Sequence, residues 1–127
     1  SHPDDIFVGV EAGVDTFDCV APTREARHGR IYTLDGNYNI KRSMYRDDTQ
    51  VLATDCDCPT CRAGHTRAEL RALLKSAEPA ERAGAFNLLT AHNTRFIIRL
   101  CEQIRRAIMD GSYRQFRDDF CRRYYRA

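Results

Sequence analysis

Apolar residues in the second half of the chain recur at steps of three and four, the period of an amphipathic helix. The longest stripe predicts a helix that begins at Pro79 and ends at Asp110-Gly111. Shorter helices are expected to begin at Thr66 and Ser112, because each opens a capping-box pattern with Glu or Gln three positions later. The long stripe consists of Phe86, Leu89, Asn93, Phe96, Leu100, Ile104 and Ala107. The last helix carries one aromatic face, formed by Tyr113, Phe116, Phe120 and Tyr124.

The first half of the chain predicts shorter elements of both kinds. Pro3, the acidic pair after it and the stop signal Gly13 predict a helix. Residues 14–20 are rich in β-branched and aromatic side chains and predict a strand, which Pro22 ends before a polar, arginine-bearing loop over 23–30. A helix followed at once by a strand is the αβ step of a larger α/β fold, so we expect the chain to begin in mid-fold.

A small antiparallel hairpin is expected next. Residues 30–34 and 38–41 are extended in character and flank Asp35-Gly36, a dipeptide that favours a tight turn. Residues 45–54 show no clear period, and we expect them to be extended with irregular turns.

The composition is that of a soluble globular chain and excludes collagen-like or disordered sequence. The chain has 127 residues, of which 43% are hydrophobic and 30% charged, enough for one domain. Apolar runs such as Phe96-Ile97-Ile98 are soon interrupted by arginine, so no segment is expected to span a membrane. No basic stretch precedes an apolar one, so no secretory signal is expected.

The charge is unevenly distributed. Lys and Arg exceed Asp and Glu by only two overall, but residues 1–60 carry 6 basic and 11 acidic side chains, and residues 61–127 carry 14 and 7. A basic second half can meet the phosphates of a nucleic acid, although solvated helix faces have the same composition.

Three of the six cysteines form a C-x-C-x2-C knuckle, Cys56-Asp57-Cys58-Pro59-Thr60-Cys61. Three thiols so close together cannot all pair with one another, so a metal site is the better interpretation. Tetrahedral zinc needs a fourth ligand, commonly a histidine. His65 is nearer in sequence, whereas His92 would attach the long helix to the knuckle, and the spacing leaves both open.

An iron–sulfur cluster is an alternative for the knuckle, but it usually takes four thiolates. Cys101 is the one plausible addition, and both Cys101 and Cys121 stand among apolar helix residues typical of core thiols.

Two further features carry candidate chemistry. Asp18 lies at the predicted end of a strand between apolar neighbours, where a carboxylate is costly to bury unless it is paired or used. Strand ends of this kind build the active sites of (β/α)8 barrels, although a turn-capping Asp is an equal alternative. The arginines of residues 23–30 could bind phosphate or a base edge, or simply be solvated.

Three motifs, in this order, resemble the tRNA-guanine transglycosylases, also called queuine tRNA-ribosyltransferases. The first is GVDTFDCVAPTREARHG (residues 13–29), the second Tyr45-Arg46-Asp47-Asp48, and the third joins the cysteine knuckle to Ala91-His92-Asn93. The resemblance covers essentially the whole chain but only the C-terminal portion of the family, in its bacterial form. It implies the end of a TIM (β/α)8 barrel, with residues 1–29 as the last αβ step, followed over 30–127 by an inserted zinc-binding subdomain with the hairpin and C-terminal helices.

The resemblance also implies roles for individual residues. Asp18 falls on the nucleophilic aspartate of the family, and His92 rather than His65 falls on the histidine ligand of the zinc. The other zinc ligands are implied to be Cys56, Cys58 and Cys61. The segment that recognises the wobble base corresponds to Thr23, Arg24, Glu25, Ala26 and Arg27. The stretch from Cys61 to His92 is a few residues longer than in the family, and we expect the excess around 76–82 to form a loop between two helices.

The implied activity is that of a pentosyltransferase acting in queuosine biosynthesis. It replaces guanine at the anticodon wobble position of tRNA with a 7-deazaguanine base, queuine or its precursor, through a covalent aspartyl-ribosyl intermediate. The implied setting is cytoplasmic, and the implied assembly is a homodimer whose interface involves the zinc region. In the family the proton donor and the base pocket lie upstream, so the chain alone is expected to be inactive. The main alternative is a non-catalytic zinc-knuckle module for RNA binding or subunit docking, which would not need Asp18.

Overall fold

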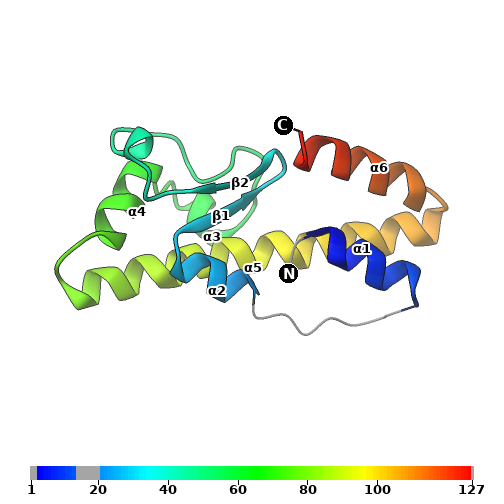
Figure 1. The fold of residues 1–127 in the computed structure, drawn as a ribbon, viewed down its shortest axis with the longest axis horizontal. Coiled ribbons are helices and arrows are strands. Elements are labelled where there is room, and N and C mark those ends of the chain that lie inside the picture. The colour runs from blue at the N-terminus through cyan, green and yellow to red at the C-terminus, as the bar shows by residue number, and fades with distance from the viewer. Residues whose placement is uncertain (1–2, 14–20, 127) are drawn as a thin grey trace.

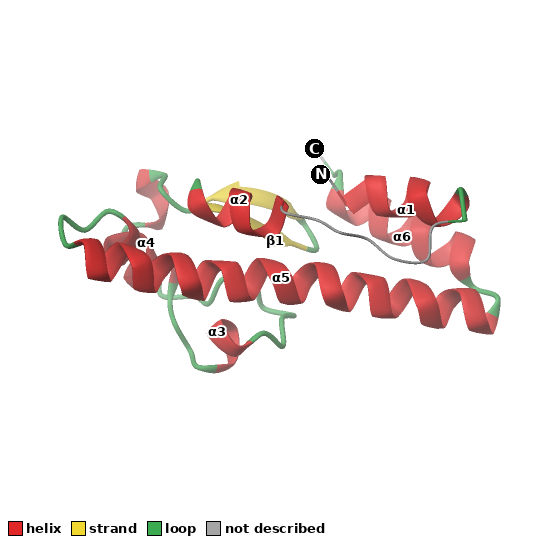
Figure 2. Ribbon diagram, turned by 90° about the horizontal axis from the view of Figure 1, so that it is seen from below, coloured by secondary structure: helices red, strands yellow, loops and turns green. Residues whose placement is uncertain are grey.

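Helix α5 (Pro79–Asp110) is the element along which all the others are arranged (Figure 1). The computed structural model describes residues 3–13 and 21–126. Towards the start of α5 lie α2 (Ala21–Arg27), the strands β1 (Arg30–Thr33) and β2 (Gly36–Asn39), a 3-10 turn (Ser43–Tyr45), α3 (Pro59–Arg62) and α4 (Arg67–Leu74). Towards its end lie α1 (Pro3–Glu11) and α6 (Tyr113–Tyr124). Figure 2 shows α2 and the hairpin on one side of α5 and α3 on the other.

The described part of the chain is a helix-dominated mixture of helix and strand. Its one sheet is the antiparallel hairpin β1-β2, within the described ranges 3–13 and 21–126. The strand expected over 14–20, and Asp18 with it, lies outside the described residues, so the barrel remains a prediction. None of the helices in the described ranges combines the length and apolar character needed to cross a bilayer.

The first of two hydrophobic cores surrounds the start of α5. It joins α2, the hairpin, the knuckle and α4 to the first part of α5. Its buried members are Ala26, Ile31, Ile40, Leu52, Cys58, Cys61, Leu70 and Leu89. Ala26 and Ile31 therefore share a core, although they stand on either side of the expected subdomain boundary at 29/30.

The second core fills the angle between α1, α6 and the end of α5. Phe120 is its centre, with ring centroids 5.4 Å from Phe7, 6.4 Å from Phe96 and 5.6 Å from Tyr124. The predicted aromatic face of the last helix and the predicted stripe of the long helix are thus confirmed. Cys101 and Cys121 pack against this core, as expected of core thiols.

The loop predicted over 23–30 is wrong in its first half, because Ala21–Arg27 forms helix α2. Pro22 is compatible with the end of a strand, as predicted, but proline is also favoured in the first turn of a helix, where the backbone N–H has no helical partner and its absence loses no hydrogen bond. The residues after it are good helix formers, and burial of Ala26 against α5 supplies the packing.

The hairpin is confirmed, but its turn lies one residue earlier than predicted. Thr33 pairs with Gly36, so Leu34-Asp35 forms the two-residue turn and Gly36 opens β2. Gly36 has a φ of +106°, and a Cβ there would lie 3.1 Å from the carbonyl oxygen of Tyr124. Gly36 therefore permits both the hairpin turn, which needs a positive φ, and the close packing of the end of α6 against the hairpin.

The two predicted helix caps have different outcomes. Thr66 Oγ1 accepts a hydrogen bond from Glu69 N at 3.1 Å, which confirms the first cap. Ser112 makes no side-chain cap, because its hydroxyl donates to the carboxylate of Asp110 across the turn at Gly111. Gly111 ends α5 with a φ of +81°, and this turn brings Ser112 back to Asp110.

The segments around the knuckle are more ordered than expected. In the irregular stretch 45–54, Val51 forms an antiparallel bridge to Thr66. The expected loop over 76–82 is only a short turn, because α5 already begins at Pro79. Ser76 stabilises this turn by accepting a hydrogen bond from Glu78 N at 3.0 Å and donating one to Glu81.

Truncation of Phe120 should destabilise the chain strongly. Phe120 is 7% exposed, and Phe120→Ala removes a ring that contacts both α1 and α5, for a loss of about 3 kcal/mol in the free energy of unfolding. Met109→Ala on the same side of the molecule is the control, because Met109 is 81% exposed and should change that free energy by less than about 0.5 kcal/mol. Urea unfolding followed by circular dichroism measures both, and equal losses would contradict this description of the core.

Candidate metal centre

The structure brings Cys56, Cys58, Cys61 and His92 together in one compact cluster. Their ligand atoms all lie within 4.8 Å of one another. His92 Nδ1 is 3.4 Å, 3.3 Å and 3.5 Å from the sulfurs of Cys56, Cys58 and Cys61. Cys58 and His92 are completely buried and Cys61 nearly so. The knuckle thus meets the long helix at His92, as the resemblance implied.

These distances fit tetrahedral zinc. Bonds of about 2.3 Å to sulfur and about 2.0 Å to nitrogen place a sulfur and a nitrogen ligand about 3.5 Å apart. The nitrogen–sulfur distances of 3.3 to 3.5 Å in the cluster agree with that value. Three soft thiolates and one imidazole are also the donor set of structural zinc sites, in which the protein fills all four positions. The cluster is therefore a potential zinc site of the closed, structural kind.

The knuckle is shaped by hydrogen bonds from its own backbone to its sulfurs. Cys58 N donates to Cys56 Sγ and Cys61 N donates to Cys58 Sγ, each at 3.3 Å. Cys58 caps the short helix α3, which begins at Pro59. Proline suits a first helical position, so the CDCPTC sequence itself favours a turn that aims the three sulfurs at one point.

The orientation of the His92 ring is fixed from its far side. His92 Nε2 lies 2.8 Å from the carbonyl oxygen of Tyr32 in β1. Because a carbonyl only accepts, the ring proton is assigned to Nε2, which leaves the Nδ1 lone pair facing the sulfurs. A carbonyl of this kind commonly supports a metal-bound histidine.

The other candidate histidine has a different partner. His65 Nδ1 lies 2.9 Å from Glu69 Oε1, one turn away on α4, and His65 does not belong to the cluster. The open choice from the spacing is thereby resolved in favour of His92.

Contacts within the knuckle shift the pKa values of Cys58 and Cys61 in opposite directions. Hydrogen bonds from the thiols of Cys56 and Cys61 lower the pKa of Cys58, because they stabilise its thiolate. The same sulfur–sulfur contacts, together with burial, raise the pKa of Cys61. A divalent cation is what would let all three sulfurs ionise together, since it replaces mutual repulsion with attraction.

Arginines of α5 hold the knuckle from outside. Arg95 makes a bidentate pair with Asp57, with both N–O distances at 2.9 Å, and lowers the pKa of that carboxyl to about 2. One turn further along α5, Arg99 Nη1 donates to the carbonyl oxygen of Asp55 at 2.6 Å. The two residues that flank Cys56 are thus both attached to α5.

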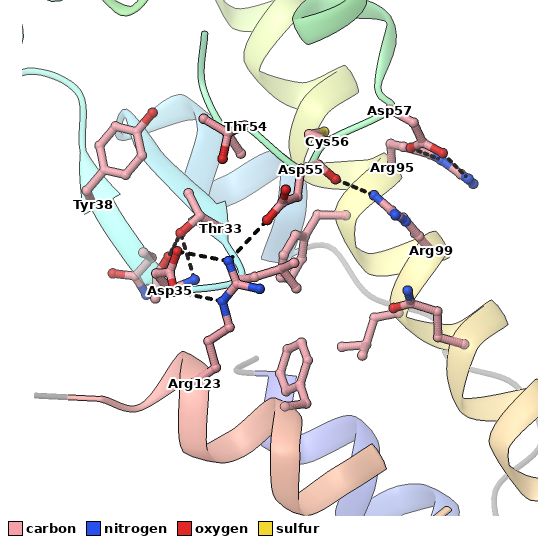
Figure 3. A pocket seen from close by; sticks show the side chains of 18 of the residues that line it. Thr33, Asp35, Tyr38, Thr54, Asp55, Cys56, Asp57, Arg95, Arg99 and Arg123 are labelled. Carbon is pink, nitrogen blue, oxygen red and sulfur yellow. Dashed lines mark hydrogen bonds and ion pairs between the residues drawn. The ribbon is translucent and has the colours of Figure 1, made fainter. Parts of the chain in front are cut away.

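A cavity of about 290 Å³ lies beside this contact, between the hairpin, the knuckle, α5 and α6 (Figure 3). Arg123 of α6 reaches across it to Asp35 at 2.7 Å and to Asp55 at 3.1 Å. Bidentate pairing with Arg123 lowers the pKa of Asp35. The last helix is therefore connected both to the hairpin turn and to the knuckle.

The five residues implied to recognise the wobble base lie on α2, in different environments. Arg24 and Arg27 are exposed, and the Arg27 guanidinium stands 5.5 Å from the centroid of the Phe86 ring. Glu25 forms an ion pair with Arg30 at 3.1 Å. Thr23 is partly buried and the Ala26 side chain is fully buried in the first core. The nucleophile candidate Asp18 lies outside the described residues.

The sequence analysis missed the polar role of Asn93. It counted Asn93 as part of an apolar stripe, yet the side chain is fully buried and hydrogen-bonds three backbone groups, in Pro22, Arg30 and Tyr32. The sequence did contain a signal for this role, namely a single amide in a stripe of Leu, Phe and Ile. Because buried polar groups are hydrogen-bonded in folded proteins, an amide at such a position indicates a buried hydrogen-bonding role.

Comparison with known proteins gives one consistent result. A family model described as queuine tRNA-ribosyltransferase matches residues 1–126. A queuine tRNA-ribosyltransferase of Dictyoglomus turgidum is 46% identical over 124 residues, which cover 98% of this chain and 31% of that protein. Those of Lactococcus lactis subsp. cremoris (strain SK11) and Pelotomaculum thermopropionicum are each 44% identical over 122 residues, covering 96% of this chain and 31% and 32% of the respective relative. The chain thus spans about a third of the length of these curated relatives.

Elemental analysis should find one zinc per chain. His92→Ala should reduce the zinc content well below one, whereas His65→Ala, which alters a histidine outside the cluster, should retain it. Removal of zinc by a chelator should accelerate amide exchange in α5 near His92, because metal binding and folding are coupled in closed sites. Iron in place of zinc, or loss of zinc in His65→Ala with retention in His92→Ala, would overturn the assignment.

Proposed function

The chain belongs to the queuine tRNA-ribosyltransferase family, and from this we propose that it is the C-terminal part of an enzyme that exchanges guanine for a 7-deazaguanine base at the tRNA wobble position. The observation that carries the proposal is the Cys3His cluster, formed by the knuckle and α5, in a chain that the family model matches from residue 1 to 126. The cluster would hold the metal with four protein ligands, so the metal would supply rigidity and the chemistry would fall to other side chains.

Asp18 is the proposed nucleophile. Its carboxylate oxygen would form a bond to the ribose C1′ as the bond from C1′ to guanine breaks, through an oxocarbenium-like state. The departing guanine needs a proton, which a general acid outside this chain would supply. The 7-deazaguanine base then bonds to C1′ through its ring nitrogen, gives the proton of that nitrogen to a general base outside this chain, and releases the carboxylate. Since the general acid and the base pocket are proposed to lie upstream, the chain alone would be inactive.

Arg24 and Arg27 are proposed to contact the anticodon loop. Both are exposed on α2, and the aromatic ring beneath Arg27 restricts where its guanidinium can lie. A planar guanidinium suits the base edges and phosphates of an unpaired loop. Thr23, Glu25 and Ala26 complete the segment, with Ala26 contributing through its packing, and the basic residues beyond 61 would add phosphate contacts.

The remaining parts of the proposal concern the whole protein. We propose that it works in the cytoplasm, where tRNA is modified, and as a homodimer whose interface involves the zinc-binding region.

Asp18→Asn should abolish exchange in the full-length enzyme. The change keeps the size and most hydrogen bonds of the side chain but removes the oxygen nucleophile, so turnover should fall by several orders of magnitude while tRNA binding survives. Wild-type enzyme denatured during turnover should carry a covalent tRNA adduct that Asp18→Asn lacks. Asp119→Asn, on the exposed side of α6, should behave as wild type.

A merely turn-capping Asp18 would tolerate asparagine, because Asn is a comparable cap. Near-normal turnover in Asp18→Asn, or an adduct that maps to Cys19, would refute the assignment, and the first result would favour the docking-module alternative.

Arg24→Ala should weaken discrimination in favour of the target tRNA by about 1–3 kcal/mol, because a guanidinium that reads a base edge contributes that much. Binding titrations with a cognate and a non-cognate anticodon stem-loop measure the difference. Arg106→Ala is the matched control. It also removes an exposed arginine, but one proposed to contact only phosphates, so it should weaken the binding of both RNAs alike and leave the discrimination unchanged. Equal affinities of Arg24→Ala and wild type for both RNAs would show that α2 does not contact the loop.

A further inference from the structure

Asn93 is a fully buried amide in the middle of α5, and it makes three hydrogen bonds, one as acceptor and two as donor. Its Oδ1 accepts from Tyr32 N at 3.2 Å. Its Nδ2 donates to the carbonyl oxygen of Arg30 at 2.9 Å and to that of Pro22 at 3.3 Å. The two carbonyls can only accept, so the assignment of oxygen and nitrogen in the amide is unambiguous.

These bonds hold the segment from α2 to β1 at both of its ends. Pro22 lies in the first turn of α2, and Arg30 is the first residue of β1. Between them, Gly29 has a φ of +80°, and a Cβ there would lie 3.2 Å from Lys41 Cγ and 3.3 Å from Leu74 Cδ2. The connection is therefore tight. Ala21, Pro22 and Ala26 of α2 are buried, and the Asn93 amide adds hydrogen bonds from α5 to both ends of the segment.

The same amide is adjacent to the metal centre. Tyr32 donates its N–H to Asn93 and accepts at its carbonyl from Nε2 of His92, the neighbouring residue on α5. Nδ1 of His92 faces the three sulfurs. The backbone of one β1 residue, Tyr32, is thus hydrogen-bonded both by His92 of the cluster and by Asn93, which also bonds the α2 segment.

We propose that Asn93 is a positioning residue for RNA recognition, which holds α2 at the place from which Arg24 and Arg27 meet the anticodon loop. The inference rests on the proposed function for the identity of the RNA, and on the Asn93 hydrogen bonds for the placement of α2. Asn93 does not itself contact RNA in this account, since its side chain is buried.

Asn93→Asp in the full-length protein is the most direct test. The new carboxylate can still accept the hydrogen bond from Tyr32 N. Its second oxygen replaces the amide nitrogen that donates to the carbonyls of Pro22 and Arg30, so both hydrogen bonds are lost and the oxygens repel one another. Thr90→Val is the control on the same helix, because the buried Thr90 hydroxyl has no hydrogen-bond partner within the described residues and its loss should be neutral.

Four quantities are measured: zinc content, amide exchange over 21–30, the Kd for an anticodon stem-loop, and the effect of Arg24→Ala in each background. Asn93→Asp should keep one zinc per chain, accelerate exchange over 21–30 and weaken RNA binding about tenfold or more. Arg24→Ala should then weaken RNA binding less in the Asn93→Asp background than in wild type, because an arginine on a displaced helix already contributes less to the affinity. A general loss of stability would not produce that non-additivity.

Unchanged exchange over 21–30, unchanged RNA affinity, or strictly additive effects of the two substitutions would each overturn the proposal. If Asn93→Asp does not retain zinc, Asn93→Ala, which removes the donors without adding charge, is measured in its place. Loss of zinc in both variants would make Asn93 a general determinant of folding and would also overturn the proposal. If Arg24→Ala alone leaves the RNA affinity of the wild type unchanged, the proposed contact between α2 and the anticodon loop fails, and the exchange data still decide whether Asn93 holds α2.

Discussion

Two consecutive side chains of α5, His92 and Asn93, hydrogen-bond the backbone of the same β1 residue, Tyr32. The Tyr32 carbonyl accepts from His92 Nε2 at 2.8 Å, and its N–H donates to Asn93 Oδ1 at 3.2 Å. In a buried setting neither bond can be replaced by water, so each is costly to break. Because His92 also completes the cysteine cluster, the hairpin, the knuckle and α5 are held at one point.

The cysteine–histidine cluster and α2 can therefore be considered as one unit with two ends. At one end three sulfurs and His92 form a closed donor set, which suits a structural metal and leaves no position for a substrate. At the other end α2 carries the exposed arginines Arg24 and Arg27. Ion pairs of Arg95 and Arg123 with the knuckle carboxylates connect this unit to α5 and α6 at its surface. Their exposure makes each of these pairs weak by itself, and the buried bonds contribute more.

Much of this could be predicted from the sequence, where local signals agree with the tertiary structure. The stripe on α5, the Thr66 cap and the knuckle could be predicted, because helical period, hydroxyl capping and thiol spacing depend on neighbours along the chain.

Helix α2 was not predicted, because Pro22 is compatible with both a strand end and a helix start, and only the burial of Ala26 decides between them. The Ser112 hydroxyl likewise could either cap α6 or bond to Asp110, and the turn at Gly111 places it against the Asp110 carboxylate. The histidine ligand and the role of Asn93 depend on contacts across some 30 to 70 residues, which spacing alone does not encode. Asp18 lies outside the described residues, so its role rests on the family.

X-ray absorption at the zinc edge tests most directly whether the cysteine knuckle and α5 are joined through the metal. The account predicts three sulfur ligands at about 2.3 Å and one nitrogen ligand at about 2.0 Å in the purified protein. It also predicts that the nitrogen contribution disappears in whatever metal-bound fraction His92→Ala retains, while His65→Ala keeps it. A site with four sulfurs, or one whose nitrogen ligand survives in His92→Ala, would contradict the account.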